Sequence, residues 1–149
     1  MITLILGHKG AGKTKKLIEL VKVAIDNTKG NVVCIEKGNM LTTDINYRAR
    51  LISTDSYEVK GYASFYGFLA GVCAGDHDIT DILIDATLRI GGRNYDELAS
   101  FLEKVYELST VNEKNFVFTE KIIQKQEKKL FKSYEFGNGR PGITVNARV

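Results

Sequence analysis

The stretch Gly7-His8-Lys9-Gly10-Ala11-Gly12-Lys13-Thr14 decides the fold of this 149-residue chain. It follows a short apolar run, residues 2–6, and precedes an amphipathic helical pattern over residues 13–27. The glycines let the backbone adopt positive φ values and approach an anion closely. Successive N–H groups then line a nest for anions, and the following helix directs the positive end of its dipole into it. The sequence therefore predicts a phosphate-binding loop between a strand and a helix.

The spacing GxxxxGK[ST] also assigns roles to side chains. Lys13 is suited to neutralising the β- and γ-phosphates of a nucleotide, and the Thr14 hydroxyl is a hard oxygen ligand for Mg²⁺. The side chains of His8 and Lys9 are expected to point to solvent, with contact to a phosphate or to a partner as the alternative. The predicted nucleotide-binding residues are Gly7, His8, Lys9, Gly10, Ala11, Gly12, Lys13 and Thr14.

A carboxylate ends another predicted buried strand, which covers residues 81–85. Apolar residues bury this strand, and Asp85 emerges at its carboxyl end, where parallel sheets bind ligands. We expect Asp85 to hold Mg²⁺ directly or through water, so the candidate metal ligands are Thr14 and Asp85. Ala86 occupies the next position, where many hydrolysing proteins carry a glutamate that polarises water. A catalytic base would then come from elsewhere, with Asp44, Asp55 and Glu36 as candidates, or hydrolysis would be slow or depend on a partner.

Two arginines, Arg89 and Arg93, lie in a predicted mobile loop containing Gly91-Gly92. One interpretation is that they stabilise the charge that develops on the γ-phosphate or contact a neighbouring subunit. The other is an ordinary pair of surface arginines near a helix start. With Lys13 and Asp85, they complete the set of candidate catalytic residues.

Strands alternate with helical patterns, which predicts an α/β fold: a three-layer sandwich with a mostly parallel sheet and helices on both faces. The domain is predicted to cover residues 1–136, followed by a Gly-rich tail, 137–149, or by a late strand at 143–145. A Gly30 C-cap is expected to end the first helix, and Asn94 is expected to cap a later one. The other predicted strands cover residues 31–36, 50–53 and 116–118, and the other predicted helices cover 63–74, 95–109 and 120–136.

Composition narrows the function classes. Apolar residues make up 44% and charged residues 26%, as in globular proteins, and no apolar run approaches the ~20 residues that span a bilayer. We therefore expect a cytoplasmic protein. Residues 120–149 carry seven Lys or Arg against three Asp or Glu, but without a stacking array of aromatic residues a nucleic-acid partner is not predicted. Cys34 and Cys73 are interpreted as small buried hydrophobic residues.

The loop and the Asp85 strand resemble the Walker A and Walker B motifs of the P-loop NTPase superfamily. The strand order is similar to recombinase-type and thymidine-kinase-type members, and the layout resembles small uncharacterised bacterial ATP-binding proteins. This resemblance implies a nucleoside triphosphate as ligand, most simply ATP because no NKxD-type guanine signature is present, with Mg²⁺ as cofactor. It implies weak or partner-dependent ATPase activity in an unspecified pathway, with a protein partner or a homo-oligomer. The alternatives are a nucleoside or nucleotide kinase, and a nucleotide-binding module without turnover.

Overall fold

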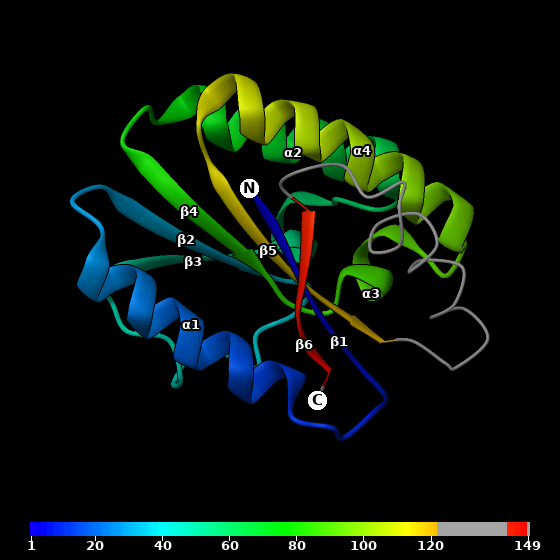
Figure 1. Ribbon diagram of the computed structural model, residues 1–149, viewed down its shortest axis with the longest axis horizontal. Helices are drawn as coiled ribbons and strands as arrows, with labels where there is room; N and C mark the ends of the chain where they lie inside the picture. The colour runs from blue at the N-terminus through cyan, green and yellow to red at the C-terminus, as the bar shows by residue number, and fades with distance from the viewer. Residues whose placement is uncertain (122–142, 149) are drawn as a thin grey trace.

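A six-stranded parallel sheet forms the middle layer of the molecule, whose computed structural model describes residues 1–121 and 143–148 (Figure 1). The strand order is β3-β2-β4-β5-β1-β6, and every pairing is parallel. The predicted α/β fold with a parallel sheet is confirmed. The strands are β1 Ile2–Gly7, β2 Asn31–Glu36, β3 Ala49–Ser53, β4 Ile79–Ile84, β5 Asn115–Lys121 and β6 Ile143–Arg148.

Helices cover both faces of the sheet, so the apolar strands are buried on two sides. Helix α1 (Lys13–Asn27) lies on one face, and α2 (Tyr62–Gly75) and α4 (Tyr95–Asn112) lie on the other (Figure 1). A short helix, α3 (Thr87–Gly91), and a 3₁₀ turn, η1 (Thr54–Tyr57), complete the described elements. No described helix is long and apolar enough to cross a membrane.

Each face has its own hydrophobic core. On the α1 face, Leu17, Val21 and Ile25 pack with buried strand residues such as Cys34. On the opposite face, the Phe101 ring of α4 has its centroid 5.1 Å from that of Phe65 and 5.8 Å from that of Phe118. These rings fix α2 and α4 against β5. Both cysteines are buried free thiols, as expected.

Several predicted element boundaries are confirmed or only slightly shifted. The Asn94 side chain accepts hydrogen bonds from the N–H groups of Asp96 at 3.0 Å and Glu97 at 3.1 Å, and it caps α4 as predicted. Asp85 follows β4 directly, at the carboxyl edge of the sheet. The strand predicted at residues 143–145, as the alternative to a tail, is present as β6. It covers six residues and pairs with β1.

Three local predictions were wrong. The helix predicted from residue 120 does not begin there, because Glu120 and Lys121 extend β5 and pair with Leu6 and Gly7 of β1. The remainder of that predicted helix lies outside the described residues. The loop predicted around the two arginines is helical over Thr87–Gly91, since Ala86 in the left-handed conformation (φ 55°) turns the chain straight into α3.

The third correction concerns the end of α1. Thr28 closes this helix by donating its N–H to the Ala24 carbonyl, and Gly30 is not a left-handed C-cap. A Cβ at Gly30 would lie 2.2 Å from the Asp78 carbonyl oxygen. Glycine is therefore required at this position for close approach of two backbone segments rather than for helix capping.

Candidate functional site

The glycine loop, residues 7–14, connects β1 to α1 at the carboxyl edge of the sheet. Gly10 and Gly12 have φ values of 80° and 94°, the left-handed region that favours glycine. Gly7 was predicted to share this role, but it closes β1 and is not among the positive-φ residues. Gly12 is the N-cap of α1 and has no side chain to accept from the first-turn N–H groups, so these donors stay directed at the loop.

Lys13 is held back against the loop. Its Nζ donates to the His8 carbonyl at 2.7 Å. Partial burial lowers the pKa of Lys13, the Asp85 carboxylate opposes this shift, and the neighbouring Lys121 ammonium adds to it. The ammonium group therefore lies near both a carboxylate and a second cation. An anion entering the loop would replace a carbonyl with a full negative charge as the partner of Lys13.

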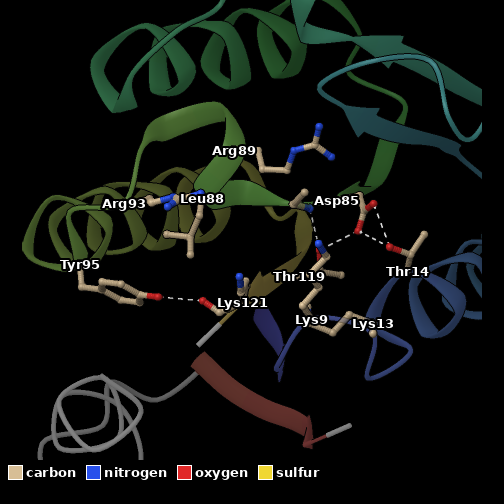
Figure 2. Close-up of a pocket in the computed structure, with 12 residues that line it drawn as sticks. Lys9, Lys13, Thr14, Asp85, Leu88, Arg89, Arg93, Tyr95, Thr119 and Lys121 are labelled. Carbon is tan, nitrogen blue, oxygen red and sulfur yellow. Dashed lines mark hydrogen bonds between the residues drawn. The ribbon is translucent and has the colours of Figure 1, made fainter. Parts of the chain in front are cut away.

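Asp85 is bound by two hydroxyl groups from different elements (Figure 2). Thr14 Oγ1, at the start of α1, donates to Asp85 Oδ2 at 3.1 Å, and Thr119 Oγ1, on β5, donates to Asp85 Oδ1 at 2.7 Å. The Asp85 N–H donates to the Ile35 carbonyl of β2 at 2.9 Å. The carboxylate thus has a fixed position, next to the hydroxyl of the glycine loop.

The Thr14 and Asp85 oxygens fit a small divalent cation. Adjacent ligands of an octahedral ion bound at ~2.1 Å are separated by about 3.0 Å, close to the 3.1 Å between these two atoms. Mg²⁺ in phosphate-binding proteins typically takes one or two carboxylates and completes its shell with substrate and water. The described residues contain no cluster of three or more His, Cys, Asp or Glu side chains that could hold a metal without such help.

Thr119 belongs to the site but was not predicted from the sequence. The residue is 1% exposed, and its hydroxyl donates to Asp85 and accepts from the Ala86 N–H at 2.7 Å. The available signal was a polar residue directly after the apolar run Phe116-Val117-Phe118. Its relevance depends on β5 lying between β1 and β4, which is a property of the folded sheet.

A cavity of about 670 Å³ opens beside the glycine loop and Asp85. The predicted residues Lys9, Arg89 and Arg93 line it together with Lys13, and Lys121 and Tyr95 also contribute. His8 is exposed and is not among the lining residues. The structure therefore brings the two arginines, the loop and Asp85 to one cavity.

The three candidate bases lie elsewhere. Asp55 forms an ion pair with Lys37 at 3.0 Å. Glu36 is buried and accepts hydrogen bonds from the N–H groups of Met40 and Leu41. Asp44 is exposed, and none of the three lines the cavity. Among the described residues that line the cavity, Asp85 is the sole carboxylate.

One further acid, Glu120, lies close to this edge of the sheet. Side chains alternate along β5, so Glu120 points to the face opposite that of Thr119 and Lys121. Glu120 is fully buried, and neither carboxyl oxygen has a hydrogen-bond partner within the described part of the chain. Burial raises the pKa of Glu120 to about 8, and the adjacent Thr87 hydroxyl acts weakly in the other direction. At pH 7 this carboxyl group is therefore mostly protonated and uncharged.

No protein-family model and no curated protein sequence matches the chain. Its structure is similar to the crystal structure of the flagellar accessory protein FlaH from Methanocaldococcus jannaschii, with a TM-score of 0.57. The match covers 92% of this chain and 73% of that chain, at 13% sequence identity. At this identity the likeness concerns the fold, and function has to be argued from the site.

Proposed function

We propose that this chain is a P-loop nucleotide-binding protein whose ligand is Mg-ATP. The observation that carries the proposal is the hydrogen bond between Thr14 and Asp85, which are 71 positions apart in sequence. A glycine-rich turn that matched the motif by chance would not be expected to have its threonine next to the carboxylate that ends β4. The pair supports a site in which both oxygens contribute to one cation.

In the proposed complex the loop N–H groups and the α1 N-terminus bind phosphate oxygens, and the Lys13 ammonium group leaves the His8 carbonyl for the β- and γ-phosphates. Thr14 and Asp85 hold Mg²⁺, which would supply charge neutralisation between the phosphates. Thr119 orients the Asp85 carboxylate. Arg89 and Arg93 are proposed to act on charge that develops at the γ-phosphate, or to contact a protein partner or a second copy of the chain.

We propose weak or partner-dependent ATP hydrolysis as the activity. The support is that, within the part of the chain that the structure describes, Asp85 is the only acid lining the cavity, and that it is already assigned to the cation. A base for water would have to be supplied by a partner or by a rearrangement. The same observation supports the alternative of a binding module without turnover, whereas the abundance of cations in the cavity supports a nucleoside or nucleotide kinase.

Lys13→Ala tests nucleotide binding. We expect ATP affinity, measured by calorimetry in Mg²⁺, to fall at least tenfold, because a charge-assisted contact to phosphate is worth about 1.5–3 kcal/mol. The exposed Lys22→Ala, on the same helix, is the matched control and should stay within twofold. Circular dichroism should show both variants folded, and unchanged affinity in folded Lys13→Ala would refute the proposal.

Asp85→Asn tests the cation. The amide keeps the shape of the side chain but loses its charge, so nucleotide affinity should fall about tenfold or more in Mg²⁺ and less than threefold in EDTA. Asp26→Asn, at an exposed position of α1, should change neither value. Equal losses for Asp85→Asn in both conditions would show that Asp85 is not a metal ligand.

An assay of nucleotide consumption separates the three activities. Phosphate release from ATP alone supports hydrolysis, and a phosphorylated product formed only with added nucleosides or nucleotides supports a kinase. Tight Mg-ATP binding without consumption supports the binding module.

A further inference from the structure

The sheet ends at β3, whose far side has no partner among the described strands. The pairing identifies the backbone groups that are free there. Ile35 of β2 directs its carbonyl to β4, where it accepts from the Asp85 N–H, so the preceding Cys34 directs its own backbone groups to β3. Cys34 lies opposite Leu51. A residue in a parallel pair bonds the two neighbours of the residue opposite it, so Leu51 directs its N–H and C=O to the free side.

This edge lacks most of the features that protect an outermost strand. Natural sheets protect such strands with proline, bulges or charged side chains, because a free edge is a template for pairing with another chain. Strand β3 contains no proline, and its pairing with β2 has no bulge. Its only charged side chain is that of Arg50, which is exposed and forms no ion pair with a described residue. The free side of β3 can therefore be extended by another strand.

A groove of about 460 Å³ borders this edge, and all five residues of β3 line it. An exposed tyrosine lies beyond each end of the strand. Tyr47, two residues before β3, is 92% exposed, and Tyr57, at the end of η1, is 59% exposed, and both line the groove. The Tyr57 ring is stacked on Phe68 of α2, with 6.3 Å between the centroids. The edge thus combines free backbone groups at its centre with aromatic surface at its ends.

This surface is self-complementary, so a second copy of the chain fits it. If two β3 strands pair antiparallel with Leu51 opposite Leu51 of the second copy, these two residues exchange N–H···O bonds. Arg50 then lies opposite Ile52 of the second copy, so like charges are not directly opposed. A two-fold axis reverses the strand direction, which brings Tyr47 of each copy to the end of the edge that leads to Tyr57 of the other.

The aromatic area at this edge is a substantial part of what a dimer requires. At roughly 200 Å² per aromatic side chain, the exposed parts of Tyr47 and Tyr57 amount to about 300 Å² per copy. Each partner in a standard protein interface buries about 800 Å². The two rings therefore supply more than a third of that area before β3 itself is counted. Helix α2, which packs on this part of the sheet through Phe68, carries no charged residue along its length.

We propose that two copies of this chain associate edge to edge through β3. The two strands pair antiparallel around a two-fold axis at Leu51, and the two six-stranded sheets form one continuous sheet of twelve strands. Tyr47 of each copy packs near Tyr57 of the other. The glycine loop and Asp85 follow β1 and β4, so each copy retains its own candidate site, and the association does not depend on nucleotide binding.

Sedimentation equilibrium of the full chain tests the association. The protein should be mostly dimeric at about 100 μM, as expected for an interface near the lower end of the standard size. Tyr47→Lys should raise the dimer dissociation constant tenfold or more, because a lysine at a sheet edge opposes strand pairing. Val111→Lys, at a similarly exposed apolar position that does not line the groove, is the matched control and should change it less than twofold. A monomer at 100 μM, or equal effects of the two variants, would overturn the proposal.

Leu51→Cys tests the register. The Cα atoms of a hydrogen-bonded antiparallel pair are about 5.5 Å apart, which suits a disulfide, so mild oxidation should link this variant into covalent dimers. The unaltered chain should not be linked, because Cys34 and Cys73 are buried. Lys29→Cys, at an exposed position outside the groove, is the matched control. Linkage of Leu51→Cys no faster than that of Lys29→Cys would refute pairing through β3. If circular dichroism shows Leu51→Cys unfolded, Tyr47→Lys decides the question at an exposed position.

Discussion

Glu120 occupies an environment that disfavours its charged form. A carboxylate without partners in a protein interior is costly, so such a group keeps its proton instead. The Tyr62 and Tyr95 hydroxyls do not donate to it, because Tyr62 donates to the Gly92 carbonyl at 2.7 Å and Tyr95 donates to that of Lys121. Burial, and after it the charge of Glu120, raises the pKa values of both tyrosines. The residue therefore links the stability of the fold to pH.

The sign of this link follows from the pKa values. The folded state holds the Glu120 proton up to a pKa of about 8, whereas an unfolded glutamate releases it near pH 4.5. Folding therefore takes up a proton between these values, and the free energy of unfolding should fall with rising pH by up to about 1.4 kcal/mol per unit. Glu120→Gln, a neutral isostere, should remove this contribution. Urea unfolding of both proteins from pH 5 to pH 8 measures it, and parallel stability profiles would contradict it.

Helix α3 is the element on which the arginines depend. It begins directly after Asp85 and Ala86, and its last residue, Gly91, packs against the Tyr62 ring of α2. A Cβ at Gly91 would lie 2.1 Å from Tyr62 Cε1. The sequence alone suggested a mobile loop here, because two adjacent glycines usually interrupt a helix. The packing against Tyr62 gives Gly91 a different role, since only glycine permits this contact between α3 and α2.

Two glycine-to-alanine variants test this role of Gly91. Gly91→Ala should lower the free energy of unfolding by about 1–3 kcal/mol, because the new methyl group would overlap a buried ring. Gly67→Ala, in α2, is the matched control, since its Cβ would meet no described atom within 4 Å. There alanine should raise stability by about 0.5–1 kcal/mol through its higher helix propensity. Thermal unfolding of both variants provides the comparison, and equal shifts would exclude a packing role for Gly91.

At the scale of the whole molecule, the strand order assembles the candidate site. Residues 7–14 and Asp85 could be predicted because each is a local pattern: a glycine turn between strand and helix, and an acid after an apolar strand. Thr119 and Lys121 could not, since their contribution requires β5 to lie between β1 and β4. The end of β5 was mistaken for a helix start because its last two residues are charged, although they continue the pairing with β1.

Because the proposed ligand contacts β1, α1 and β4 together, its binding should stabilise the whole fold. A ligand that binds only the native state adds RT ln(1 + [L]/Kd) to the free energy of unfolding, about 2.7 kcal/mol at a concentration of one hundred times Kd. Mg-AMPPNP, a non-hydrolysable ATP analogue, should therefore raise the melting temperature in proportion to the logarithm of its concentration. Lys13→Ala should show a much smaller rise, and an identical rise in both proteins would place the nucleotide elsewhere.

The position of β1 between β5 and β6 also bears on how the protein is made. The strand that leads into the glycine loop is synthesised before the other described strands, yet its two neighbours, β5 and β6, are the last of these strands. Ile2 pairs with Phe116 on one side and with Ile143 on the other. Such long-range parallel contacts form slowly, because a long loop must close before they contribute. During synthesis β1 therefore remains without its sheet partners until β5 and β6 have been made, and the glycine loop is held by a complete sheet only after that point.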